Sequence, residues 1–120
     1  MAEAQPAVSG QPVVVTLPRE IDLANAPQAG RQLGAALATG ATIVVADMTG
    51  TTFCDSMGMR ALVMAHKRAA ACHAELRVVV PSAGIRRVMA ITKVDTVLRL
   101  YRRLDAALAA DPGSRGDQDK

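Results

Sequence analysis

The sequence predicts one domain of the α/β class, in which helices pack on a largely parallel sheet. Segments of strand composition alternate with segments whose apolar residues recur at helical spacing. The run TIVVADM at residues 42–48 is apolar throughout before its aspartate, as expected of a central strand covered on both faces. With 120 residues, half of them hydrophobic, the chain is long enough for one core and too short for two ordinary domains.

The first half of the chain alternates strand, helix, strand and helix. Residues 13–17, VVVTL, are mostly β-branched and lie between two prolines, which predicts a strand. A helix follows, because Asn25 is a preferred cap, Pro27 is tolerated in a first turn, and Gly40 ends the helical spacing. After the buried strand at 42–48 comes the polar loop TGTTFCD. A second helix is then expected at 56–72.

The second half repeats the alternation in shorter segments. The run ELRVVV at 75–80 predicts a strand that ends at a proline, and the remaining expected elements are a helix at 84–91, an edge strand at 96–101 and a helix at 104–110. The domain is expected over residues 12–110. A flexible N-terminus at 1–11 and a disordered tail at 111–120 flank it, because the tail has no apolar content.

Composition and charge argue against several classes of protein. The net charge is +3, but the positive residues are scattered, and only Phe53 and Tyr101 are aromatic, so no stacking surface for nucleic acid is expected. Cys54 and Cys72 fit no metal-binding spacing and are expected to be reduced thiols. The first residues lack the features of a signal peptide, and no apolar run is long enough to cross a bilayer, so we expect a cytoplasmic protein without membrane insertion.

Polar residues gather where the predicted parallel strands end. Parallel α/β sheets carry their functional loops at the carboxyl ends of the strands. Asp22, Asp47 and the pair Asp55–Ser56 all fall just beyond such ends. A functional site is therefore expected there.

The pair Asp55–Ser56 has two interpretations. Either side chain can cap the following helix, a role worth about 1 kcal/mol. Alternatively, Ser56 is a phosphoacceptor, because a helix N-terminus tolerates an added anion and the modified protein could keep its fold. Capping needs only one of the two side chains and does not account for the polar loop before them.

Enzymatic use of Ser56 is not expected. A serine nucleophile needs a base within reach, and His66 lies ten residues on, about 15 Å along a helix. His73 sits where that helix ends. The aspartates do not show the paired-acid pattern of a magnesium-binding receiver domain, so no catalytic residue, metal or cofactor is expected.

The segment VADMTGTTFCDSMGMRALVMAHKRA resembles the signature of STAS domains, in particular those of bacterial anti-sigma factor antagonists. The resemblance runs from Val13 to about Ala110 and includes R-E-I-D at 19–22, D-x-x-x-x-x-F-x-D-S-x-G at 47–58 and the late segment PSAGIRRVMAITKVDTVLRLY. It implies a single STAS domain with a four- or five-stranded, mostly parallel mixed sheet and about four helices, mainly on one face.

The resemblance also implies a partner-switching cycle. In such cycles the dephosphorylated antagonist binds a serine-kinase anti-sigma factor and releases a sigma factor. The resemblance therefore implies a role in transcription regulation and stress response. The kinase phosphorylates the serine after the aspartate, and a serine phosphatase reverses this step. By position, Ser56 matches the phosphoacceptor, and the partner-binding surface is expected to comprise Asp22, Asp55, Ser56, Met57, Gly58 and Arg60.

Three residues depart from the family pattern. Met57 stands where a second hydroxyl residue is common, Arg60 where a small residue is common, and Arg19 where a glycine is usual. Arg60 lies about one turn from Ser56, so it could pair with a phosphate or an acidic partner, or simply be an exposed helix residue. The alternative function is that of a constitutive STAS subunit of a membrane transport complex for lipids or anions, without phosphorylation.

Overall fold

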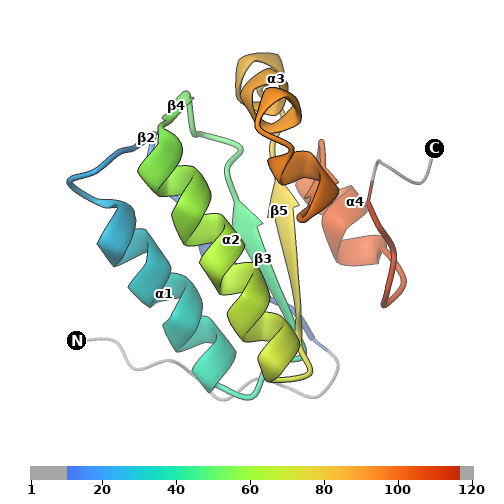
Figure 1. Cartoon of the computed structure of the whole chain (residues 1–120). Coiled ribbons are helices and arrows are strands. Elements are labelled where there is room, and N and C mark those ends of the chain that lie inside the picture. Colours follow the sequence, from blue (N-terminus) through green and yellow to red (C-terminus); the bar gives the residue numbers. More distant parts are fainter. Residues whose placement is uncertain (1–10, 117–120) are drawn as a thin grey trace.

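The protein, seen here in a computed structural model, is built around a four-stranded parallel sheet (Figure 1). The structure describes residues 11–116. The strands follow the order β1 (Val13–Thr16), β3 (Ile43–Asp47), β5 (Glu75–Val79) and β6 (Arg99–Tyr101). A second, two-stranded parallel sheet joins β2 (Glu20–Ile21) to β4 (Phe53–Cys54) near the start of the second helix.

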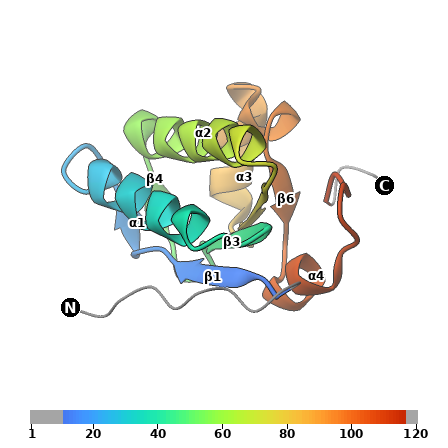
Figure 2. The same ribbon diagram turned by 90° about the horizontal axis from the view of Figure 1, so that it is seen from below.

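Three helices cover one face of the main sheet, and a fourth covers the other (Figure 2). Their bounds are α1 (Ala26–Ala38), α2 (Ser56–Ala71), α3 (Ala83–Ile91) and α4 (Leu104–Ala109). The helices α1, α2 and α3 each connect two neighbouring parallel strands, and the strand order always advances in the same direction. Because such crossovers are right-handed, the three helices lie on the same face. The α/β prediction, with helices mainly on one face, is confirmed, and every described strand pair is parallel.

The central strands β3 and β5 supply side chains to two cores. Alternate residues of a strand point to opposite faces, so Val44 and Ala46 pack under α1 and α2 while Val45 packs under α4. The smaller core beneath α4 consists of Val45, Val79, Tyr101 and Ala107. Burial on both faces explains why residues 42–48 show a continuous apolar run rather than an alternating one.

Two expectations for the C-terminal part differ from the structure. Residues 94–96 form a short 3₁₀ helix, and strand β6 begins only at Arg99, because turn hydrogen bonds take up the backbone amides of residues 96–98. Residues 111–116 lie against the domain instead of being disordered. The Gly113 amide donates to Glu75 Oε1 at 2.9 Å, and Gly116 forms a β-bridge with Leu100. Residues 117–120, and the expected flexible start except for residue 11, lie outside the described residues.

The sequence did not predict β2 and β4. Each has two residues, too few to show any periodicity, and both fall in segments with loop composition. Their pairing nevertheless joins the loop before α1 to the loop before α2. Within residues 11–116, no helix is long and apolar enough to cross a membrane.

Candidate functional site

Asp55 forms the N-cap of α2 and also holds a distant loop. Its Oδ1 accepts hydrogen bonds from the backbone amides of Met57 at 2.9 Å and Gly58 at 3.0 Å. Its Oδ2 accepts from the amide of Leu23 at 3.1 Å, across 32 residues of sequence. The capping interpretation therefore holds for Asp55, and this carboxylate fixes the loop after β2 to the start of α2.

Ser56 is the first residue of α2 and is exposed. Within residues 11–116, its hydroxyl forms no hydrogen bond. Because Asp55 alone caps the helix, the Ser56 hydroxyl is left unengaged at the surface beside a carboxylate. No base among the described residues is hydrogen-bonded to it, so the arrangement suits modification by an external enzyme rather than nucleophilic attack by this protein.

Asp22 lies in the loop that Asp55 holds. Its Oδ1 accepts from the amide of Ala24 at 3.0 Å. The sequence predicted that Asn25 caps α1, but its side chain makes no capping hydrogen bond. It folds back over this loop instead. Its Oδ1 accepts from the Asp22 amide at 2.9 Å, and its Nδ2 donates to the Glu20 carbonyl at 2.8 Å. These bonds fix Asp22 on the same edge as Asp55.

Gly58 is buried and faces the two-stranded sheet rather than solvent. A Cβ at this position would lie 2.5 Å from Cys54 Sγ and 2.8 Å from Cγ2 of Ile21. Such distances are far shorter than van der Waals contact, so only glycine lets α2 approach β2 and β4 this closely. Of the expected partner-binding residues, Gly58 is therefore a buried residue that lets the start of α2 pack on β2 and β4. Met57 and Arg60 are exposed.

Three exposed apolar side chains border the site. Leu23 is 68% exposed, Phe53 50% and Met57 38%. Leu23 and Phe53 were not predicted from the sequence as site residues. One signal was available, since Phe53 is the only phenylalanine of the chain and stands in an otherwise polar loop. Exposed Leu, Phe and Met around a polar centre are typical of a protein-binding surface.

Asp47 lies apart from this surface. It is buried at the end of β3, where its Oδ1 accepts from the amide of Thr49 at 3.0 Å and from the hydroxyl of the same residue. It therefore shapes the turn after β3. Among residues 11–116, no group of three or more His, Cys, Asp or Glu side chains is arranged to hold a metal ion.

Cys54, next to the site, is buried, and its burial raises the pKa of the thiol to about 11, with the Asp55 carboxylate adding to the rise. Because the thiolate is the reactive form, we expect iodoacetamide at pH 7.5 to alkylate exposed Cys72 at least ten times faster than Cys54. Mass spectrometry of timed samples measures both rates. In denaturant the two rates should converge, and equal rates in the folded protein would contradict this description of Cys54.

Comparisons with known proteins agree with this architecture. A model of the STAS domain family matches residues 2–107. Among solved structures, an anti-sigma factor antagonist from Mycobacterium paratuberculosis is 26% identical and superposes with a TM-score of 0.70, covering 85% of this chain and 86% of that one. No curated protein matches the sequence.

Two further solved structures share the fold at lower identity. A proposed anti-sigma factor antagonist of Thermotoga maritima, TM1081, is 20% identical with a TM-score of 0.69, over 78% of this chain and 83% of that one. The anti-sigma factor antagonist SpoIIAA in its unphosphorylated form is 22% identical with a TM-score of 0.57, over 71% and 78% of the respective chains.

Proposed function

Because this chain belongs to the STAS domain family, we propose that it is an anti-sigma factor antagonist whose binding to a serine-kinase anti-sigma factor is switched by phosphorylation of Ser56. In this proposal the unphosphorylated protein binds the kinase and thereby releases a sigma factor. A serine phosphatase regenerates the binding form. The protein itself is a cytoplasmic regulator and catalyses no reaction.

The observation that carries this proposal is the division of roles between Asp55 and Ser56. The carboxylate caps the helix, and the Ser56 hydroxyl is exposed and forms no hydrogen bond with the part of the chain that the structure describes. Ser82 is a useful contrast, because it also stands at a helix start but its Oγ accepts from the Ile85 amide at 3.2 Å. Of these two serines, only Ser56 is left available to a kinase.

The surroundings of Ser56 suit a reversible protein contact. Leu23, Phe53 and Met57 provide apolar area, and Asp22 and Asp55 provide negative charge. A phosphoserine adds about 1.5 to 2 negative charges. Placed beside Asp55, it would repel an acidic partner surface or a bound nucleotide phosphate while leaving the buried side of α2 unchanged.

Phosphopeptide mapping tests the proposal. The protein is incubated with ATP and each serine-kinase anti-sigma factor of its own organism, and we expect phosphate on Ser56. Ser56→Ala should abolish this label and bind the kinase persistently, whereas Ser82→Ala should be labelled like the wild type. Ser56→Asp should bind at least ten times more weakly while remaining folded by circular dichroism.

Two outcomes would contradict the proposal. If Ser56→Asp bound as tightly as the wild type, charge repulsion would not be the switch. If no kinase labelled Ser56, a permanent interface without phosphorylation, as in a STAS subunit of a membrane transport complex, would be the better account.

A further inference from the structure

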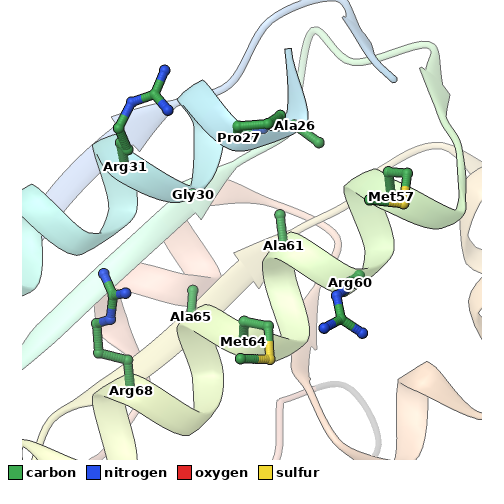
Figure 3. A pocket seen from close by; sticks show the side chains of 10 residues that line it. All are labelled: Ala26, Pro27, Gly30, Arg31, Met57, Arg60, Ala61, Met64, Ala65 and Arg68. Carbon is green, nitrogen blue, oxygen red and sulfur yellow. The ribbon is translucent and has the colours of Figure 1, made fainter. Parts of the chain in front are cut away.

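A groove lies between α1 and α2, beside the phosphoacceptor site (Figure 3). Its cavity volume is about 300 Å³. The helices face each other there through small residues, including Gly30 on α1 and Ala61 and Ala65 on α2, so no large side chain fills the space. Met57 and Met64 also line the groove, and Met64 is 49% exposed.

Three arginines line the same groove. They are Arg31 on α1 and Arg60 and Arg68 on α2. The Arg68 side chain extends toward α1, where its guanidinium occupies the space that a side chain at residue 34 would fill. Neither helix contains an aspartate or glutamate. Within residues 11–116, none of these three arginines forms an ion pair, so no carboxylate of that part of the chain neutralises their charge.

The groove is continuous with the site at Ser56. Met57, which lines it, directly follows Ser56, and Arg60 lies about one helical turn further on. A partner that covers Ser56 therefore has the groove within its footprint. The surface has negative charge at one end, from Asp22 and Asp55, and positive charge along the helices, from the three arginines.

We propose that this groove, lined by Met57, Met64 and the three arginines, is a second contact for the kinase partner and receives an acidic segment that carries apolar side chains. This inference rests on the proposed function and adds to it the chemistry of the partner. Apolar side chains would pack against the methionines, and carboxylates would face the guanidinium groups, which pair with carboxylates in bidentate geometry. Arginine and methionine are both enriched in protein interfaces.

The same arrangement links the groove to phosphorylation. A phosphate on Ser56 would add negative charge at the end of the groove and would compete with the acidic segment for Arg60, four residues along the helix. Phosphorylation would thus weaken both contacts. By reciprocity of binding free energies, a partner that holds the groove disfavours the phosphorylated form.

The test measures binding of the kinase that binds the wild type. We expect Arg31→Glu/Arg68→Glu to weaken binding at least five-fold, mainly through slower association, and to reduce its dependence on salt. The matched control is Arg87→Glu/Lys93→Glu, which changes the net charge equally at exposed positions on and after α3. We expect this control to bind within two-fold of the wild type. Circular dichroism establishes that both variants are folded.

Four other outcomes would contradict the inference, and each has a different meaning. Equal weakening by both pairs would mean that only overall charge matters. If the groove variant bound like the wild type while Ser56→Asp did not, the groove would be irrelevant and the proposed function would stand. If the groove variant abolished self-association of this chain but not kinase binding, the occupant would be a second copy. If no kinase bound even the wild type, both proposals would fall.

Discussion

Replacing Arg77 with alanine is expected to lower the free energy of unfolding by about 3–5 kcal/mol, because it removes a fully buried side chain together with its hydrogen bonds and leaves a cavity. The Arg77 side chain is fully buried beneath α4. Its Nε lies 2.8 Å from Glu75 Oε2, and its Nη1 donates to the Ala107 carbonyl at 2.7 Å. This side chain therefore ties α4 to the central strand β5.

Urea denaturation of the wild type and of Arg77→Ala measures the effect. Arg77→Met is the matched variant, because it keeps most of the volume and removes the charge. Glu75 retains the Arg99 guanidinium at 3.8 Å and the Gly113 amide, so its carboxylate is not left without partners. We expect Arg77→Met to lose much less stability than Arg77→Ala, since the methionine side chain fills most of the cavity that alanine would leave. A loss below about 1 kcal/mol for Arg77→Ala would contradict the structural role assigned to this residue.

Replacing Gly58 with valine is expected to cost roughly 3 kcal/mol, the upper end of the range for overpacking a core. The new Cβ would meet Cys54 Sγ at 2.5 Å and Cγ2 of Ile21 at 2.8 Å, before the two methyl groups are considered. Either α2 moves away from β2 and β4, or the pairing of these strands is lost. Thermal and urea unfolding measure the loss.

Gly30 provides the control for Gly58. It lies within α1, and a Cβ there would meet no atom within 4 Å. Gly30→Val should therefore change stability by less than about 1 kcal/mol, since valine has a higher helix propensity than glycine. Adding Cys54→Ala to Gly58→Val should restore part of the lost stability by removing the sulfur. Equal losses at the two glycines would refute the steric account.

The two predictions differ in what they mean for function. Arg77 lies on the face of the sheet away from α1 and α2, so Arg77→Met should keep kinase binding. Gly58 lies on the buried face of the first turn of α2, so any shift there moves Ser56 and the Asp55 contact to Leu23. A Gly58 variant that remains folded should therefore also bind the kinase more weakly than the wild type.

Local sequence patterns were sufficient to predict the elements in which those patterns are strong. The continuous apolar run of β3, the strand composition of β5, the helical spacing after Ser56 and the positions of the loop aspartates could all be predicted, because periodicity and turn chemistry depend on neighbouring residues. The motif ending in Asp55, Ser56 and Gly58 also located the candidate site. The strand expected from residue 96 began later, because local turn hydrogen bonds prevailed over β-branched composition.

Packing between elements determines how distant segments meet, and no local pattern predicted it. This packing joined Leu23 to Asp55 across 32 residues, paired two-residue strands, and placed Arg77 beneath a helix thirty residues further along the chain. It also placed three arginines along one groove. A local pattern fixes which face of an element is apolar. Which residues lie across that face depends on packing between elements, as the bond from the Leu23 amide to Asp55 shows.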